Sequence, residues 1–491
     1  MTAPATNDEK HHGRPWWRWL LWGILILLII PVMAVLVLQL EPVQDYIRRQ
    51  GEQYLQKKLH TTVRIGYLRI RGWQYLELRN VYVADTSKQA LFYSGNLKVR
   101  YNLLAFLNNE LRINGLEWDS VTANIYRNTG DSTFNYQFIV DAFVTKDTIP
   151  DTVSSKTGTT LQFLIKDVNL RHVALRYADA PGGMTAVVTF QELQVDPDDL
   201  LVNQGLYSVR GLKIDGLRGF FTQDYRPKVL AASAPPPAND TASSPFHLII
   251  KKLEIQNSSF LYADQGSGLS TGWKIGKLQL LNSSMDIDST LIQVGELSIQ
   301  HTGGMLAMNV PKDTSAPAPA DSSAPNTWRV LATKAELDHI NMRYDNNTAP
   351  APRGAGSKDP DYNHLLLKDF VAHIGNINYN PDTLSAVLHS ISVQDKSGFG
   401  IKKGHFDVLY TPTTIALRNL LLETNRSILR KQIVLNAPAW STISDHLDLL
   451  QLQANLDSTH IALGEFLPFV PDSRKNPSMK PLWDKEIFLT T

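Results

Sequence analysis

Cysteine is absent from this chain of 491 residues. That absence excludes a disulfide framework, a thiolate metal site and a cysteine nucleophile. An excess of charge of one sign is also missing, because 48 Lys and Arg residues stand against 47 Asp and Glu residues. Nucleic-acid binders need a basic surface that neutralises phosphates, so the composition argues against that class of protein.

The sequence also lacks the motifs of the common enzyme classes. It contains no nucleophile elbow, P-loop, dinucleotide fingerprint, HExxH helix or calcium loop. His11 and His12 belong to a polar tail, which favours solvated side chains over a metal site. Four carboxylates near strand ends have positions typical of turn caps, namely Asp131, Asp141, Asp179 and Asp264. We therefore expect a protein that is not an enzyme and that uses no cofactor or metal.

Charged residues are missing again between Leu20 and Leu40, in the run LLWGILILLIIPVMAVLVLQL. A helix of this length spans roughly 30 Å, the thickness of bilayer hydrocarbon. Amphipathic indole rings, which prefer the headgroup layer, crowd its first end at Trp16, Trp17, Trp19 and Trp22. We predict a transmembrane helix over residues 19–40. A cleaved signal peptide is the alternative, but its apolar core would be only about 7 to 15 residues long.

The charges on either side of this segment predict its orientation. Basic residues precede it and acidic residues follow it, at Lys10, Arg14, Arg18, Glu41 and Asp45. Positive charge is retained on the cytoplasmic side of a membrane. We therefore expect residues 1–18 to form a cytoplasmic tail, and the long remainder of the chain to lie outside the cytoplasm.

A second helix is predicted directly after the span, over residues 41–60. Its apolar residues recur at helical spacing, at Val43, Ile47, Tyr54, Leu55 and Leu59. The helix is basic and amphipathic, so it could lie on the outer surface of the membrane. The alternative is a helix that caps the β-structure that follows, and we favour this cap.

The body of the chain, residues 61–491, has the period of two that is typical of β-strands, as in TTVRIGYLRIR and YLELRNVYVAD. Helical patterns are scarce in it. Segments rich in Pro, Ala, Ser and Asp interrupt the pattern at residues 227–245, 311–326 and 349–361. Such segments bury too little apolar surface to become ordered, so we predict mobile loops there.

A weak internal repeat occurs between these loops. Its skeleton is apolar-x-apolar-x-x-apolar-x-apolar-x-Tyr, which makes Tyr177, Tyr262 and Tyr344 equivalent, with Ile125 in the first copy and Tyr379 in a fainter fifth. Two polar residues in succession would turn the second half of a strand to the wrong face, so a β-bulge is predicted at each pair. A leucine-rich solenoid would need a period of about 20 to 29, which is missing.

Strands with one apolar face must bury it against something, and helices to cover it are scarce here. Sheets could pack on each other as sandwiches, or one long sheet could curl into a gutter with its apolar face inward. In the gutter the repeats predict a set of lipid-facing side chains, which are Val168, Leu170, Val173, Leu175, Leu253, Ile255, Phe260, Leu337, Ile340 and Met342.

The chain resembles the amino-terminal part of TamB-type proteins in the AsmA-like family. The likeness rests on the single anchor, the following YLQKKLHTTVRIGYLRIRGWQYLELRNVYVAD, the run LNNELRINGLEWDSVTANIYRNTGDSTFNYQFIVDAF, and YNPDTLSAVLHSISVQDKSGFGIKK. It implies a single-pass inner-membrane protein of diderm bacteria. Its periplasmic body would be a long curled antiparallel sheet, a taco-like groove that carries phospholipid toward the outer membrane in outer-membrane biogenesis.

The same resemblance implies a second role as a translocation and assembly module. Such proteins assist the insertion of outer-membrane proteins or protein secretion, together with an Omp85-type outer-membrane barrel. Family members are usually far longer and end in a carboxy-terminal domain that meets this partner. This chain stops at FLTT, so we expect it to be a fragment or a truncated paralogue, without that contact. A third alternative, which we favour less than these two, is an envelope hydrolase with an unrecognised site.

Overall fold

The computed structural model of this chain describes residues 17–72, 74–102, 110–143, 162–201, 206–225, 247–312, 327–350, 361, 363–440, 449–469 and 477–489. The polar tail with His11, His12 and Trp16 lies outside these residues. So does the predicted loop 227–245, together with most of the loops 311–326 and 349–361. The prediction that these segments are mobile therefore stays a prediction.

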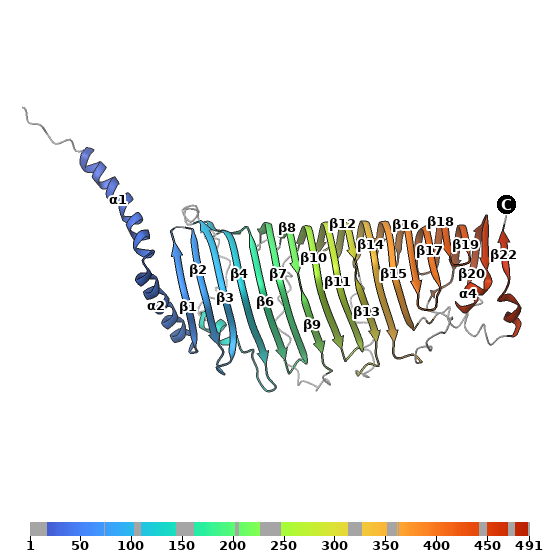
Figure 1. Ribbon diagram of the computed structural model, residues 1–491, viewed down its shortest axis with the longest axis horizontal. Helices are drawn as coiled ribbons and strands as arrows, with labels where there is room; N and C mark the ends of the chain where they lie inside the picture. The colour runs from blue at the N-terminus through green and yellow to red at the C-terminus, as the bar shows by residue number, and fades with distance from the viewer. Residues whose placement is uncertain are drawn as a thin grey trace, which may run out of the picture.

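The described residues form one large β-sheet of 22 strands, which runs the length of the molecule (Figure 1). This confirms a mostly β protein. In chain order the strands are β1 (Val63–Arg71), β2 (Tyr75–Ala84), β3 (Ala90–Asn102), β4 (Glu110–Arg127), β5 (Gln162–Ile165), β6 (Val168–Asp179), β7 (Met184–Leu201), β8 (Leu206–Asp215), β9 (Arg218–Gln223), β10 (His247–Asp264), β11 (Leu269–Asp286), β12 (Leu291–Gln300), β13 (Gly303–Met308), β14 (Arg329–Asn346), β15 (His364–Tyr379), β16 (Leu384–Asp395), β17 (Gly400–Tyr410), β18 (Thr414–Thr424), β19 (Ile428–Asn436), β20 (Gln451–Leu456), β21 (Thr459–Ala462) and β22 (Glu486–Leu489).

Helices are confined to the two ends of the sheet. α1 (Trp17–Leu38) and α2 (Glu41–Leu59) precede it, and α2 is the helix predicted over residues 41–60. The short α3 (Gln137–Phe143) follows β4, and α4 (Leu463–Phe466) leads into the 3₁₀ turns η6 (Leu467–Phe469) and η7 (Pro477–Leu482) near β22. The sequence pattern did not predict α3 or α4, because each has too few turns to show a helical period.

The apolar run forms α1, whose side chains are described only in part. Trp22 and Leu40 are exposed, at 62% and 55%, whereas the side chains of Trp17, Trp19 and Leu20 are not among those described. Within the described part of the chain, no helix meets the length and hydropathy expected of a bilayer span.

The prediction of an antiparallel sheet is wrong in three places, where neighbouring strands run parallel. β4 pairs parallel with β5 and β6, β10 with β8 and β9, and β14 with β12 and β13. A parallel pair needs a long crossover that returns the chain to the starting edge. Residues 128–161, 224–246 and 309–328 make these connections, and the second and third contain two of the Pro-rich segments found in the sequence.

Nine of the 22 strands contain a residue in the left-handed region, where the strand bends. In the four repeats this is the second residue of the polar pair, and the positive φ angles belong to Ser120, His172, Asn257 and His339. Ser120 and His172 lie opposite each other between aligned pairs, so neither strand gains a residue. The predicted β-bulges are thus mostly matched bends. Among the four repeats a register shift accompanies the bend only in β14, after Leu337, while shifts also occur at the bends of Asp369 and Asn419.

Glycines let the neighbouring strands approach at these bends. A Cβ added to Gly95 would lie 2.7 Å from the Cβ of Ser120, and one added to Gly276 would lie 2.6 Å from the carbonyl oxygen of His301. Real Cβ contacts are never that short, so a larger residue would push the strands apart. The bends therefore form one line across the sheet.

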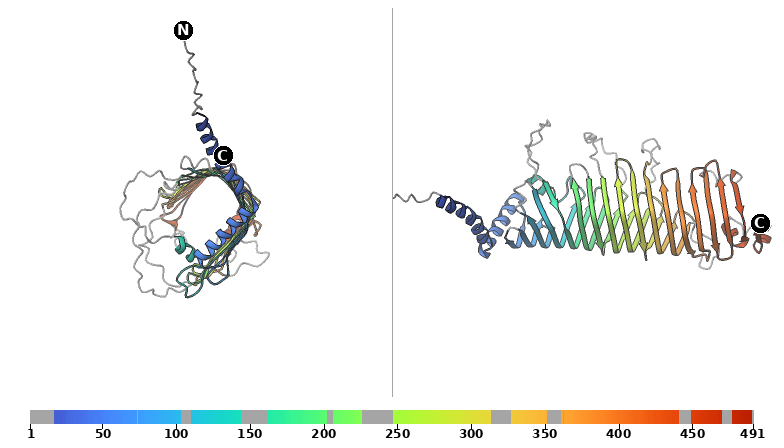
Figure 2. Two further views of the ribbon diagram at one scale, coloured as in Figure 1. Left: turned by 90° about the vertical axis from the view of Figure 1, so that its left-hand side faces the viewer. Right: turned by 90° about the horizontal axis from the view of Figure 1, so that it is seen from above.

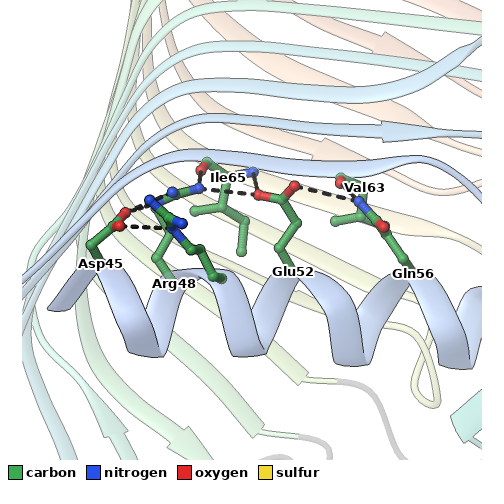
Figure 3. Close-up of polar contacts among 7 residues, drawn as sticks. Asp45, Arg48, Glu52, Gln56, Val63 and Ile65 are labelled. Carbon is green, nitrogen blue, oxygen red and sulfur yellow. Dashed lines mark hydrogen bonds and ion pairs between the residues drawn. The ribbon is translucent and has the colours of Figure 1, made fainter. Parts of the chain in front are cut away.

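Helix α2 covers the free edge of β1, and this confirms the prediction of a cap. One polar stripe of α2 binds the backbone of that strand (Figure 3). Arg48 Nη1 donates to the Ile65 carbonyl at 2.9 Å and Gln56 Nε2 to the Val63 carbonyl at 2.6 Å, while the Ile65 N–H donates to Glu52 at 3.2 Å. Gln44 reaches the Ile70 carbonyl at 2.8 Å. These bonds satisfy backbone groups that a bare edge strand would expose.

Candidate functional site: the apolar face of the sheet

One unbroken row of apolar or glycine residues crosses sixteen strands. Each member is the register partner of the next, from β1 to β19. We call this the central row, and it consists of Leu68, Leu78, Leu97, Trp118, Leu170, Leu193, Ile214, Ile255, Leu278, Ile299, Leu337, Ala372, Ile391, Gly404, Leu422 and Leu429.

Two further apolar rows flank the central row. The second row lies two residues away along each strand, or three in β16, where the register shifts. It contains Leu76, Val99, Leu116, Val168, Val195, Leu212, Leu253, Leu280, Leu297, Ala335, Ile374 and Leu388. The third row lies beyond the bends and contains Val63, Val83, Phe92, Ala123, Leu175, Val188, Gly219, Phe260, Trp273, Gly304, Met342 and Leu367.

A direct contact shows that the rows on both sides of the bends share one face. The rings of Phe92 in the third row and Trp118 in the central row lie 5.9 Å apart. The Trp118 indole also donates to Ser94, beside the bend, at 2.7 Å. The left-handed residue restores the alternation that the polar pair would reverse. We call the face that carries the three rows the apolar face.

All ten side chains predicted to meet lipid lie on this face. Val168 and Leu253 are in the second row, Leu170, Ile255 and Leu337 in the central row, and Leu175, Phe260 and Met342 in the third row; Val173 and Ile340 follow the bends directly. Leu175 and Met342 are 41% and 36% exposed. Val173 and Ile340 are buried at 5% and 4%, so they are poorly placed for direct contact with a ligand.

Burial beside the bends shows which way the sheet curves. In each of the four repeats the residue after the left-handed position lies on the apolar face and is nearly inaccessible, as for Val121, Val173 and Ser258, while Ser120, His172 and Asn257 themselves are exposed. Side chains crowd on the inside of a bend and spread on its outside. The apolar face is therefore the inner one, and the end view shows the strands as an open arc (Figure 2, left).

No second layer of strands packs on the apolar face within the described residues. Substantial contacts between strands occur only between hydrogen-bonded neighbours of the one sheet. The sandwich alternative is therefore wrong. Two packed sheets would bring non-neighbouring strands into contact and bury both inner faces.

We call the opposite face of the same strands the outer face. On the side of the bends that holds the central and second rows, the outer face carries mostly polar residues, and many of them form ion pairs. Arg171 contacts Glu192 at 3.2 Å, and His172 contacts Asp119 at 2.9 Å. The hydrogen bond with His172 holds the pKa of Asp119 below its ordinary value. Hydrogen bonds, first from Gln194 and then from Asn169 and Arg171, lower the pKa of Glu192. The outer face is thus suited to water.

The sequence did not predict two tryptophan side chains of the apolar face. Trp118 and Trp273 belong to it, although neither was among the predicted lipid-facing residues. Trp273 lies against Gly304, where an added Cβ would come within 2.4 Å of its ring. The signal for both was present, because each tryptophan falls at an apolar position of its strand, but the register that joins the strands is not readable from one sequence.

Three of the four carboxylates interpreted as structural, Asp131, Asp179 and Asp264, lie at strand ends or turns as expected, whereas Asp141 lies within α3. Asp179 forms two 2.7 Å bonds with Arg127, Asp264 accepts from the Gly266 N–H, and Asp131 accepts from the Asn128 N–H. Asp141 accepts from the Gln137 amide. No group of three or more His, Asp or Glu side chains able to hold a metal ion occurs in the part of the chain that the structure describes.

Comparisons of this chain with protein-family models, with curated proteins and with solved structures give no match.

Proposed function

We propose that the protein carries phospholipid along the apolar face, and that the curled sheet forms a trough open to acyl chains. The observation that carries this proposal is the central row, which stays apolar over sixteen strands with no protein layer packed on it among the described residues. A soluble protein rarely leaves so large an apolar surface without a partner. The resemblance to the AsmA-like family supports the same interpretation.

The energetics favour a lipid as that partner. Exposure of an acyl chain to water costs about 0.8 kcal/mol for each CH₂ group, or roughly 13 kcal/mol for a chain of about 16 carbons. An apolar trough removes most of this cost at every step along the sheet. Because the rows are unbroken, an acyl chain would meet no charged side chain on the central row between Leu68 and Leu429.

The helix α1 supports an attachment to the inner membrane. Leu20 to Leu40 carries no charge, and many of its described side chains are exposed, including Ile26 at 52% and Ile30 at 62%. α1 projects away from the sheet (Figure 1). We infer that α1 anchors the protein in a bacterial inner membrane, with its N-terminus in the cytoplasm and the sheet in the periplasm.

A second candidate function is an assembly scaffold that lends a strand edge to an incoming protein. The observation in its favour is β22, which pairs with β21 on one side and exposes all four of its residues. A strand from an outer-membrane barrel could add there by β-augmentation. The edge of β1 is less suited to this role, because α2 occupies it.

The lipid proposal is tested by a photoreactive residue in place of Phe260, in the full chain expressed in bacterial cells. We expect it to crosslink to phospholipid, because the side chain projects into the trough. The matched control is the same residue in place of Leu261, one position along β10 and on the other face. Capture of phospholipid at both positions, or of protein only at Phe260, would contradict the proposal.

A further inference from the structure

Two helices meet at the first end of the curled sheet. The polar stripe of α2 holds it to the edge of β1, and so α2 is fixed there (Figure 3). Viewed along the sheet, α2 crosses the end of the arc, and α3 lies beside its last turn on the open side (Figure 2, left). Lys58 Nζ of α2 lies 5.0 Å from the centre of the Phe143 ring of α3.

The segment that leads into α3 contacts the apolar face directly. The ring of Phe134 lies 5.5 Å from the ring of Tyr177, one of the repeat tyrosines. Tyr177 follows Leu175 of the third row by two residues, so it belongs to the same face of the sheet. Phe134, whose ring also lies 4.9 Å from the Arg127 guanidinium, thus adds an apolar ring to this face at this end.

Asn135 fastens this segment to β4 at one point. Its amide donates to the Asn124 carbonyl at 3.0 Å and accepts from the Tyr126 N–H at 3.0 Å. Beyond Asn135, the segment that contains α3 is only weakly attached to the rest of the protein. Among the described elements, α3 makes substantial contacts with α2 alone, and its apolar Val140 and Phe143 are 39% and 51% exposed.

We propose that α3 is a gate at this end of the trough, which swings about Asn135 to admit an acyl chain. The inference rests on the proposed lipid function. A helix of seven residues has little stability of its own, and weakly packed segments open at low free-energy cost. An entering chain would separate Phe143 from Lys58 and pass over the ring of Phe134, which stays on Tyr177 because it precedes the pivot and lies 4.9 Å from the Arg127 guanidinium. The acyl chain would then cover the rings of Phe134 and Phe143, which offsets the cost of opening.

The test links α3 to α2 and measures lipid capture further along the trough. Because the chain has no cysteine, Lys58→Cys and Phe143→Cys introduce the only thiols. A short bifunctional maleimide joins them in the folded full chain, which also carries the photoreactive residue in place of Phe260. The control pair is Asn169→Cys and Gln194→Cys, which are direct partners on the polar face of β6 and β7.

We expect the link between α2 and α3 to reduce phospholipid capture at position 260 to the level seen without illumination. The unlinked variant and the linked control pair should capture lipid as the parent does. Equal capture by the linked and unlinked forms would overturn the gate and leave the lipid function standing. Absence of capture in every form, the parent included, would overturn the lipid function and the gate with it.

Discussion

Asn257 illustrates how a single residue bends a strand of this sheet. Its φ is 49°, in the left-handed region, and its amide donates to Asp215 at 3.0 Å. Asn adopts this region more readily than most other residues, whereas a β-branched residue there is severely strained. The repeat bends in β4, β6 and β14 use Ser or His at the same place, with polar side chains on the outer face.

Substitution of Asn257 by Val should destabilise the protein by about 1–2 kcal/mol, since Val avoids positive φ. Replacement by Gly should be close to neutral, because Gly adopts this region without steric cost. Thermal unfolding of the purified protein measures both. Lys252→Val, at an extended position of the same strand, is the control. Equal effects of Asn257→Val and Lys252→Val would show that the bend has no conformational requirement.

The ion pair between Arg127 and Asp179 should make the free energy of unfolding depend on pH. Asp179 is buried and Arg127 half-buried, and the hydrogen bonds from Arg127 hold the pKa of Asp179 below its ordinary value of 3.8. A carboxyl with a lowered pKa in the folded state contributes stability above its unfolded pKa and loses it as the pH falls through the folded pKa.

Asp179→Asn should lower the free energy of unfolding at neutral pH by about 1–3 kcal/mol, because Arg127 loses its charged partner. The difference between this variant and the parent should shrink as the pH falls below 3.8. Unfolding temperatures of both proteins across that range measure it, with the exposed Asp131→Asn as the control. A difference that stays constant with pH would rule out this ionic contribution.

At the scale of elements, α2 shows an arrangement that the sequence analysis did not anticipate. The prediction of a helix over residues 41–60 rests on apolar positions such as Val43, Ile47 and Leu55. The structure also uses the polar residues spaced by four, Gln44, Arg48, Glu52 and Gln56, which bind the backbone of β1. A hydrophobic period predicts that a helix forms. It does not predict that the helix pairs with a strand edge through hydrogen bonds.

Glu52→Ala should loosen the edge of β1. The Ile65 N–H would lose its acceptor, and Arg48 would lose a partner at 3.2 Å. A buried donor left without a partner costs about 1–3 kcal/mol. Hydrogen exchange should show faster exchange of the Ile65 amide, and Gln53→Ala on the exposed side of α2 should leave it unchanged. An unchanged Ile65 rate in Glu52→Ala would mean that α2 does not protect this edge.

The strand content was readable from the sequence, but the direction of the strands was not. Four repeat copies fall in β4, β6, β10 and β14, and Ile125, Tyr177, Tyr262 and Tyr344 lie on one line across the sheet, linked through Ala186, Phe221, Thr271 and Leu306. The fifth copy was wrong. Tyr379 pairs with Val330 at the other edge, because β15 runs antiparallel to β14. Period and spacing do not encode direction.

The pattern also misplaced two local signals. An Asp-Pro pair is typical of a turn, yet Asp196 and Pro197 lie inside β7 at a register shift, a position where Pro is tolerated. The residues from Asp445 to Leu452 have a helical pattern, whereas β20 begins at Gln451. Residues 441–448 lie outside the described residues. Both errors arise because neighbouring strands, which the sequence does not reveal, decide local structure here.

At the scale of the whole molecule, the sheet is long because each strand packs only on its neighbours. Sixteen strands spaced by about 4.8 Å extend the central row by roughly 70 Å. The sequence predicted ten side chains of the apolar face, since alternation assigns each one to a face. It could not predict that they join into continuous rows, because this depends on the register of strands far apart in the chain, such as Ile214 with Ile255.

The central claim is that acyl chains follow the whole apolar face. A photoreactive residue placed singly at Leu97, Ile214, Ile299 and Leu422 samples the central row from one end to the other. The account predicts phospholipid capture at all four positions, and none at the outer-face neighbours Lys98, Lys213, Ser298 and Glu423. Capture confined to one end, or equal on both faces, would contradict it.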